Sequence, residues 1–318
     1  MEACTILILT YKGKRHLELL LPTVQRAIHC YHGDALIHVQ IVDNGSDEET
    51  KEFVKSNYAG YQYTFSNAND YLFSLNEFVD SLSDEWVLML NDDMKLEENV
   101  LNELIPLIRD DKNLFAVSCR IMDFDGNFTA SAVRTAKYSK GWVYTRWMDS
   151  SESQLKYTLY PGGGSAIFRT AYFNELNGFD PLYRPAYAED MDLGTRAWQK
   201  KWMTIYNPRA ILYHREGGTI NDQYKKDKLE QTMYKNHVLW MIKNSRQPGF
   251  LTWFFLMLPY RLLYNLFNSR NHFRALLQAL KKSPVALKKR KESKVLLEDK
   301  AWFRLLDRPY AISNTHPV

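Results

Sequence analysis

Residues 87–94 read "VLMLNDDM", and this stretch decides the fold that we expect. An apolar run of strand length leads directly into Asn91, Asp92 and Asp93. Adjacent carboxylates repel each other and are costly to remove from water. Such a cluster therefore requires a solvent-exposed turn, a basic partner or a metal ion.

Other apolar runs of strand length alternate with stretches that have helical periodicity. We predict strands over residues 5–10, 37–44 and 86–91, and helices over residues 14–30, 47–58, 71–82 and 97–109. Fully apolar strands that alternate with helices indicate an α/β fold. Its sheet should be Rossmann-like and mostly parallel, with helices on both faces.

Polar stretches follow three of the predicted strands, namely "TYKGK" (10–14), "DNGSDE" (43–48) and "NDDM" (91–94). Ligands of parallel sheets bind at the carboxyl ends of the strands, so we expect these stretches to share one crevice. The first strand is followed neither by the G-x-G-x-x-G of dinucleotide-binding proteins nor by a P-loop. The sequence therefore disfavours a dehydrogenase and a P-loop NTPase.

The net charge of +4 conceals an uneven distribution. Residues 245–318 contain 14 Lys and Arg but four Asp and Glu, a local charge of +10, whereas residues 1–244 carry −6. A mildly acidic body with a basic tail predicts two roles for the chain. Cys4, Cys30 and Cys119 have no C-x-x-C spacing, and we expect them to be reduced thiols of a cytoplasmic protein.

Six short motifs follow one another between residues 4 and 218. They are "TILILTYKGK" (5–14), "IVDNGSDE" (41–48), "VLMLNDDM" (87–94), "GGGSAIFRTAYFNELNGFD" (162–180), "AEDMDLGTRAWQKKW" (188–202) and "YNPRAILYH" (206–214). Their order and spacing resemble those of glycosyltransferase family 2. Members of that family are inverting, nucleotide-sugar-dependent enzymes, so the resemblance implies a GT-A fold and glycosyl transfer.

The resemblance implies a nucleotide-sugar site at the carboxyl edge of the sheet. Thr10 and Tyr11 resemble the start of the nucleoside pocket, and Asp43 resembles the carboxylate that bonds the base or ribose. Asp92 would belong to the same site. Asp93 occupies the last position of the DXD motif and would bind Mg²⁺ or Mn²⁺, which bridges the diphosphate of the donor.

Asn91 departs from the family pattern, because the first position of the DXD motif carries no charge here. Metal binding would then rely on Asp93, on the diphosphate, and on His214, which resembles a histidine close to the metal. Family members with Asn at this position include rhamnosyltransferase-like enzymes. The donor could therefore be a dTDP-sugar as well as a UDP-sugar.

Asp190 corresponds to the catalytic base of the family. Inverting transfer requires one base to accept the proton of the acceptor hydroxyl, and it requires no covalent nucleophile. Gly163 and Gly164 would form a wall that faces the sugar or the acceptor. Arg196 could contact the diphosphate or form a structural ion pair with Asp192.

Each proposed site residue also has a structural explanation. Asp92 and Asp93 could form a solvated turn before the helix that begins near Glu97, and Asp43 could belong to an ordinary turn. A single histidine such as His214 is more often a structural residue than a ligand.

Residues 222–318 lie outside the family pattern, and we expect a helical, basic region appended to a catalytic domain over residues 1–221. The most apolar stretch (249–267) is interrupted by Pro259 and Arg261, so its uninterrupted part is too short to span a bilayer. Apolar aromatic residues beside Lys and Arg are typical of helices at anionic membrane surfaces. A lid or a homodimer contact is the alternative, and no nucleic-acid module accompanies the basic charge.

We therefore expect a cytoplasmic enzyme at the inner face of a bacterial cell membrane. It would transfer a sugar from a UDP- or dTDP-sugar to a hydroxyl of a glycan or lipid-linked acceptor in surface polysaccharide biosynthesis. The alternatives are a non-catalytic glycan-binding scaffold with a degenerate site, and a nucleotidyltransferase.

Overall fold

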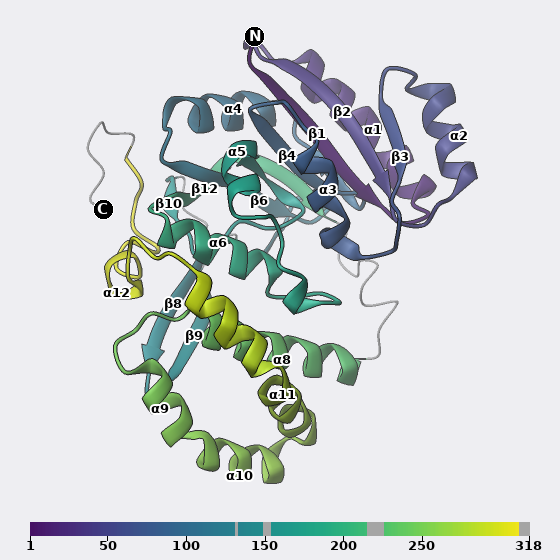
Figure 1. Cartoon of the computed structure of the whole chain (residues 1–318). Coiled ribbons are helices and arrows are strands. Elements are labelled where there is room, and N and C mark those ends of the chain that lie inside the picture. The colour runs from purple at the N-terminus through teal and green to yellow at the C-terminus, as the bar shows by residue number, and fades with distance from the viewer. Residues whose placement is uncertain (131–132, 149–153, 215–225, 312–318) are drawn as a thin grey trace.

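The computed structural model describes residues 1–130, 133–148, 154–214 and 226–311 as a mixed α/β structure (Figure 1). The strands are β1 (Ala3–Thr10), β2 (Leu36–Asp43), β3 (Gln62–Phe65), β4 (Trp86–Asn91), β5 (Met94–Leu96), β6 (Leu114–Met122), β7 (Phe128–Ala130), β8 (Arg134–Ser139), β9 (Trp142–Trp147), β10 (Lys156–Tyr157), β11 (Ser165–Arg169) and β12 (Met203–His214). The helices are α1 (Lys14–His29), α2 (Glu48–Asn57), η1 (Tyr71–Ser74), α3 (Leu75–Asp80), α4 (Val100–Asp110), α5 (Thr170–Glu175), η2 (Pro181–Tyr183), α6 (Glu189–Gln199), α8 (Lys226–Asn244), α9 (Phe250–Leu256), α10 (Leu258–Asn268), α11 (Arg270–Glu292) and α12 (Asp299–Trp302).

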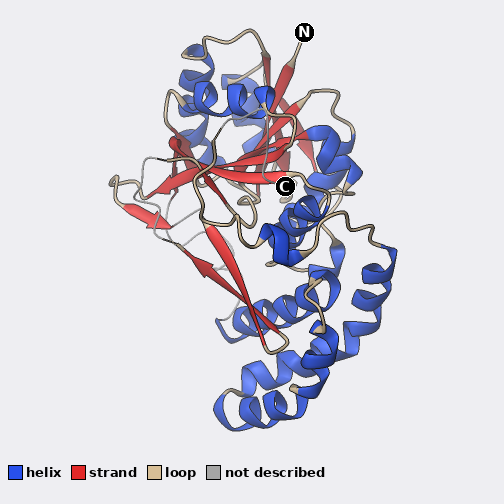
Figure 2. Cartoon of the chain, turned by 90° about the vertical axis from the view of Figure 1, so that its left-hand side faces the viewer, coloured by secondary structure: helices blue, strands red, loops and turns tan. Residues whose placement is uncertain are grey.

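One large sheet has the strand order β10-β12-β6-β11-β4-β1-β2-β3. Strands β4, β1, β2 and β3 are parallel neighbours. The sequence predicts the first three of these strands and their parallel course, but not β3. Strand β11 runs antiparallel between β4 and β6, so the sheet is mixed beyond β4. Every residue of β1 is buried, because helices cover both faces of the sheet (Figure 2).

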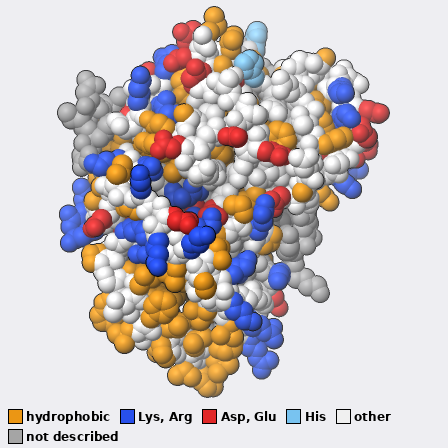
Figure 3. All heavy atoms as spheres, viewed as in Figure 1, with side chains coloured by type: hydrophobic (Ala, Val, Ile, Leu, Met, Phe, Trp, Pro, Cys, Tyr) orange, Lys and Arg blue, Asp and Glu red, His pale blue; other side chains and the backbone are white. Residues whose placement is uncertain are grey.

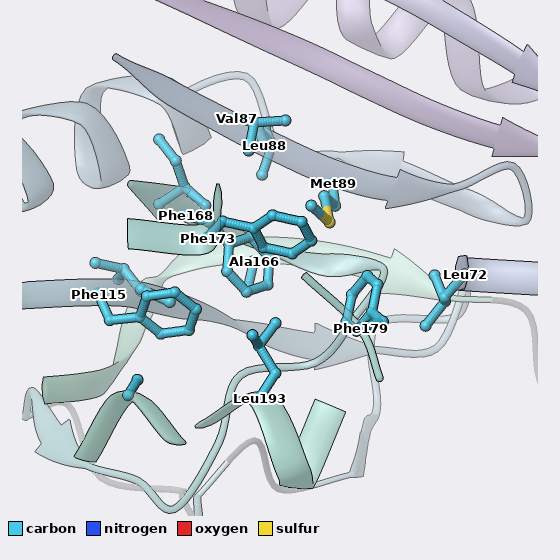
Figure 4. Packing of buried hydrophobic residues seen from close by; sticks show 14 of the residues in the cluster. Leu72, Val87, Leu88, Met89, Phe115, Ala166, Phe168, Phe173, Phe179 and Leu193 are labelled. Carbon is cyan, nitrogen blue, oxygen red and sulfur yellow. The ribbon is translucent and has the colours of Figure 1, made fainter. Parts of the chain in front are cut away.

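A series of phenylalanine rings packs β11 against its neighbours (Figure 4). The ring centroid of Phe168 in β11 lies 5.5 Å from that of Phe115 in β6 and 5.9 Å from that of Phe173 in α5. Phe173 in turn lies 5.3 Å from Phe179. All these pairs are edge-to-face, a favourable geometry for aromatic rings. The packing fixes β11 and the glycine run at 162–164 that precedes it.

Helix α8 packs into the same core as the sheet. Its residues 238–242 are buried and form one hydrophobic cluster with the strands. Trp302 of α12 joins this cluster, and its ring stacks on Trp198 of α6 with centroids 5.6 Å apart. The predicted boundary between residues 221 and 222 lies outside the described residues, and the division into two domains stays a prediction.

Strands β8 and β9 form a separate hairpin that reaches from the large sheet toward α9 (Figures 1 and 2). A Cβ atom at Gly141, in the hairpin turn, would lie 2.4 Å from the main-chain nitrogen of Phe254 in α9, so the turn requires glycine. Arg261 of α10 donates a hydrogen bond to the carbonyl of Lys140 at 2.8 Å. These contacts attach the hairpin turn to α9 and α10.

Helices α9 and α10 expose the most apolar stretch of the chain. Within the described residues, no single helix is long and apolar enough to cross a membrane. Taken together, α9 and α10 have the length and apolar composition of a membrane span, but they bend by 49° at the break between them. The exposed apolar side chains, here called the α9–α10 patch, are Trp253, Phe255, Leu256, Tyr260, Leu263, Tyr264, Leu266 and Phe267. Figure 3 shows apolar surface at this end of the molecule, with Lys and Arg side chains beside it.

A buried cluster of charges joins α6 to α8. The carboxylate of Asp192 accepts hydrogen bonds from Arg196 at 2.6 Å, from Lys243 at 2.7 Å and from Asn244 at 2.7 Å. Lys243 also bonds Asp180 at 2.7 Å. Burial opposes the charge of Asp192, but Arg196 and Lys243 outweigh this effect and hold the pKa of Asp192 below the usual aspartate range. Each of these buried charges therefore depends on its partners.

Lys243→Met should destabilise the protein by about 3–5 kcal/mol, because Asp180 and Asp192 would stay buried without their shared cation. Urea unfolding followed by circular dichroism measures this loss. Lys288→Met is the control, since the Lys288 side chain is 78% exposed and its removal should change stability little. Equal stability of the two variants would contradict a structural role for the cluster.

Candidate active site

The carboxyl ends of β1, β2 and β4 meet at one edge of the sheet, as the sequence predicts. The strand register places Thr10 beside Asp43 and Leu9 beside Asn91. Three polar stretches that are far apart in the sequence thereby become neighbours. The edge has the position that ligand sites take in α/β sheets.

Asp43 is fully buried, and both of its carboxylate oxygens accept hydrogen bonds. The main-chain N–H groups of Gly45 and Asp47 donate at 2.7 and 2.8 Å, and the Tyr63 hydroxyl donates at 2.8 Å. Asp43 therefore shapes the turn after β2, and its contact with a base or ribose stays a prediction. Tyr11, which is exposed at the end of β1, stays a predicted part of the same pocket.

Asp92 is held by protein groups on both sides. The hydroxyl of Thr10 donates to one carboxylate oxygen at 2.5 Å, and Nδ1 of His16 lies 3.2 Å from the other. A Cβ atom at Gly13 would lie 2.0 Å from Asp92, so glycine permits this contact. Thr10 and Asp92 thus join β1 to the turn after β4, and a direct contact of either with a nucleotide stays a prediction.

Asp93 and His214 come together because β5 pairs with β12. The register places His214 opposite Met94, and Nε2 of His214 lies 3.3 Å from Oδ2 of Asp93. The Oδ1 atom of Asp93 is buried without a hydrogen-bond partner in the described part of the chain, and so is Oδ1 of Asn91. Buried oxygens without partners are costly, and a bound cation would satisfy them.

These side chains fit a cation that also binds a ligand. Among the described residues, no group of three or more His, Cys, Asp or Glu could hold a metal ion by itself. Asp93 and His214 supply two ligands of these types, and Asn91 adds a neutral oxygen. Mg²⁺ commonly takes one or two protein carboxylates and completes its shell with phosphates and water. The donor set therefore suits a cation held jointly with a diphosphate.

The glycine run at 162–164 links α6 to the corner of the site that Asn91, Asp93 and His214 form. The main-chain N–H of Asn91 donates to the carbonyl of Gly164 at 3.1 Å, and a Cβ atom at Gly164 would lie 2.3 Å from Oδ1 of Asn91. The main chain of Gly163 lies near enough to the carboxylate of Asp190 to lower its pKa. Gly163 and Gly164 therefore lie between Asn91 and Asp190, and their predicted contact with the sugar or acceptor stays a prediction.

Glu189 and Asp190 form the first turn of α6. Glu189 is only 3% exposed, and burial together with the charge of Asp190 raises its pKa well above the usual range. Burial also raises the pKa of Asp190, although the nearby cation of Arg134 and the main-chain N–H of Met191, at 2.7 Å, offset part of this rise. Adjacent carboxyl groups with raised pKa values are typical of sites that transfer protons.

Tyr71 is a site residue that sequence reasoning missed. Burial, followed by the charges of Glu189 and Asp190, raises its pKa well above the usual range, and the charge of Asp93 adds to the rise. Its φ of +51° is uncommon for an aromatic residue. Strained backbone of this kind concentrates at functional sites. No sequence signal marks Tyr71, because its neighbours come from distant segments.

Arg196 does not join this group of residues. Its guanidinium bonds Asp192 and donates to the carbonyls of Leu176 at 2.5 Å and Gly178 at 2.7 Å. These contacts support the structural ion pair rather than the diphosphate contact. Arg196 therefore belongs to the buried charge cluster that joins α6 to α8.

Comparison with known proteins identifies one family. Residues 86–276, more than half of the chain, match the family model described as glycosyl transferase family group 2. A curated relative is the N-acetylglucosaminyl-diphospho-decaprenol L-rhamnosyltransferase of Mycobacterium tuberculosis (strain ATCC 25618 / H37Rv). The two sequences are 24% identical over 248 residues, which cover 70% of this chain and 79% of the relative.

Solved structures share the fold at low sequence identity. GalNAc-T7 with UDP, GalNAc and Mn²⁺ gives a TM-score of 0.63 at 14% identity, and the match covers 95% of this chain but 56% of that one. S. aureus TarS (1–349) in complex with UDP-GlcNAc gives 0.56 at 16% identity, over 92% of this chain and 84% of that one. These structural similarities confirm the predicted GT-A fold. The residues that match the family model, 86–276, contain β4, the glycine run and α6. The chain therefore belongs to glycosyl transferase family group 2 and is a glycosyltransferase.

Proposed function

We propose that the chain transfers a sugar, with inversion, from a UDP- or dTDP-sugar to a hydroxyl of a lipid-linked saccharide. The observation that carries this proposal is the glycine run, which joins the corner of Asn91, Asp93 and His214 to the carboxylate of Asp190. One end of this arrangement suits a diphosphate with its cation, and the other suits a general base.

We assign the donor to the carboxyl edge of the sheet. Asp93, His214 and Oδ1 of Asn91 would hold Mg²⁺ or Mn²⁺, and Tyr11 and Asp43 would line the nucleoside pocket. When bound, the cation would neutralise the charge that develops on the departing diphosphate. The similar structures of GalNAc-T7, with UDP and Mn²⁺, and of TarS, with UDP-GlcNAc, support this assignment.

Asp190 is the proposed base. The acceptor oxygen attacks the anomeric carbon, the bond from that carbon to the diphosphate breaks, and the hydroxyl proton passes to Asp190. Main-chain groups of Gly163 and Met191 orient its carboxylate. Burial and the charge of Asp190 raise the pKa of Glu189, which disfavours two negative charges on the pair.

The mycobacterial relative supports the substrate class. It is an L-rhamnosyltransferase that acts on N-acetylglucosaminyl-diphospho-decaprenol. We infer that this chain transfers a related sugar to a saccharide on a lipid diphosphate, during assembly of a bacterial surface polysaccharide. Asn91 at the start of the DXD motif agrees with the rhamnosyltransferase-like subgroup.

A lipid-linked acceptor would bring the enzyme to a membrane. The α9–α10 patch presents exposed apolar and aromatic side chains, and residues 245–318 carry a charge of +10. Such a surface suits the anionic inner face of the cell membrane. We therefore propose a cytoplasmic enzyme with a catalytic domain over residues 1–221 and a membrane-contacting region over residues 222–318. A homodimer through the same patch is the alternative.

Asp190→Asn should lower the transfer rate roughly 100- to 10,000-fold, because the amide cannot accept the hydroxyl proton. The rate is measured as nucleoside diphosphate release from dTDP-L-rhamnose or a UDP-sugar, with a short-chain alkyl GlcNAc-diphosphate as acceptor. Asp125→Asn, in an exposed turn, is the control. The wild-type rate should also fall with decreasing pH, beginning above the ordinary aspartate pKa of about 3.9, because burial raises the pKa of Asp190. Unchanged activity of Asp190→Asn would move the base elsewhere.

A donor nucleotide-sugar and Mn²⁺ together should raise the melting temperature. A ligand at about a hundredfold excess over its Kd stabilises by about 2.7 kcal/mol, which a thermal scan resolves. Asp93→Asn should lose the part of the shift that depends on Mn²⁺, since the amide brings no charge, whereas Asp125→Asn should keep it. A shift that is independent of Mn²⁺ would contradict the cation site. Absence of any shift with UDP-, dTDP-, GDP- and CMP-sugars would contradict the donor class.

Phe267→Glu should weaken binding to vesicles that contain anionic lipid, because Phe267 is the most exposed member of the patch at 82%. Co-sedimentation measures the bound fraction, and raising the salt concentration should lower it. Leu296→Glu is the matched control, since Leu296 is 64% exposed outside the patch. Equal vesicle binding by both variants, combined with loss of a dimer in Phe267→Glu, would favour the homodimer.

A further inference from the structure

Helix α8 contacts the loop that leads into the proposed base. This loop, residues 183–188, begins with the last residue of η2 and leads to the first turn of α6. Asn236 of α8 is fully buried, and its side-chain nitrogen lies 2.5 Å from the carbonyl oxygen of Tyr183, 2.8 Å from that of Ala186 and 2.9 Å from that of Tyr187. One side chain thus gathers three carbonyls of a single loop.

The end of this loop has an unusual backbone conformation. Tyr187 has a φ of +67° and Ala188 a φ of +73°. Residues with a Cβ atom rarely adopt these angles, and two in succession persist only where surrounding contacts hold them. Ala188 immediately precedes Glu189 and Asp190, so its backbone direction sets the position of both carboxyl groups. The hydrogen bond from Asn236 to the Tyr187 carbonyl lies at this strained point.

Helix α8 also holds the chain on the other side of the base. Asp192, two residues after Asp190, accepts hydrogen bonds from Lys243 and Asn244, both at 2.7 Å. Lys235 adds a contact to the carbonyl of Arg184 at 3.3 Å. The segment that contains Asp190 is therefore attached to α8 both before and after this residue.

We propose that Asn236 is a positioning residue for glycosyl transfer, which holds residues 183–188 in the conformation that directs Asp190 toward the acceptor hydroxyl. This role rests on the proposed function of Asp190 as the base. Asn236 acts through the loop and touches no substrate. Helix α8, which the sequence places in a C-terminal appendage, thereby supports the active site.

The test compares two buried asparagines. Asn236→Ala removes the amide that the three carbonyls share and should lower kcat roughly 10- to 100-fold, since small displacements of a catalytic group have effects of this size. The KM for dTDP-L-rhamnose should stay unchanged, because the donor residues lie on other elements. Asn207→Ala is the matched control: Asn207 of β12 is also fully buried and donates to the carbonyl of Glu103 at 2.9 Å. It should cost stability without a comparable loss of kcat.

A second substitution separates positioning from general stability. Glycine adopts a positive φ without the clash of a Cβ atom. Ala188→Gly introduced into Asn236→Ala should therefore restore part of kcat, because the loop then needs less support. Hydrogen–deuterium exchange of the peptide over residues 183–190 should be faster in Asn236→Ala than in Asn207→Ala. If Asn236→Ala does not fold, Asn236→Ser, which keeps one donor, takes its place in the same comparisons.

The outcomes distinguish this proposal from the proposed function. A folded Asn236→Ala whose kcat matches that of Asn207→Ala overturns the positioning role, and so does a loss of kcat that Ala188→Gly leaves unchanged. A wild-type protein that transfers no sugar from the UDP- and dTDP-sugars overturns the proposed function, and the role of Asn236 with it. An active wild type, a selective loss of kcat and its partial rescue support both.

Discussion

The close contact between Gly164 and Asn91 is the constraint on which the rest of the site depends. Because β11 runs antiparallel to β4, its first residues lie where β4 ends, and any side chain at position 164 would overlap Asn91. The adjoining backbone of Gly163 reaches Asp190. One short segment therefore fixes the distance between the corner that suits a diphosphate and the carboxylate that suits a base. The packing of Phe168 against its neighbouring rings holds that segment in place.

Much of this edge could be predicted from the sequence, because uninterrupted apolar strands mark a covered parallel sheet and polar residues mark their carboxyl ends. The parallel course of β1, β2 and β4 is confirmed. The GT-A fold, which the resemblance to glycosyltransferase family 2 implied, is confirmed as well. The antiparallel course of β11 could not be predicted, since strand pairing between distant segments leaves no local pattern. The same reason applies to Tyr71 and to the contacts of Asp92, whose partners are distant in the sequence. The β8–β9 hairpin is a local feature, and Gly141 in its two-residue turn is the signal that could have marked it.

The acidic start of α6 shows how structure separates residues that look alike in sequence. Glu189, Asp190 and Asp192 lie within four positions, and each could cap the helix. Asp192 faces the buried cations Arg196 and Lys243, so it keeps its charge and serves the fold. Glu189 forms no ion pair with the described residues, and burial with the charge of Asp190 raises its pKa strongly. Burial raises the pKa of Asp190, and the nearby cation of Arg134 offsets part of this rise. Burial and neighbouring charge, rather than residue type, therefore set the direction in which the pKa of each acid shifts.

The length of the β8–β9 hairpin sets the distance between α9 and the end of the hairpin that lies near Asp190. Its turn is packed against α9 through Gly141, whereas Arg134, at the other end of β8, stacks on Tyr160 and lies near Asp190. Six residues in each strand correspond to about 17 Å along the hairpin. Any surface on which α9 rests would therefore stand at a set height from the carboxylates. If that surface is the membrane proposed above, a lipid-linked acceptor would reach the carboxylates only if its head group spanned this height.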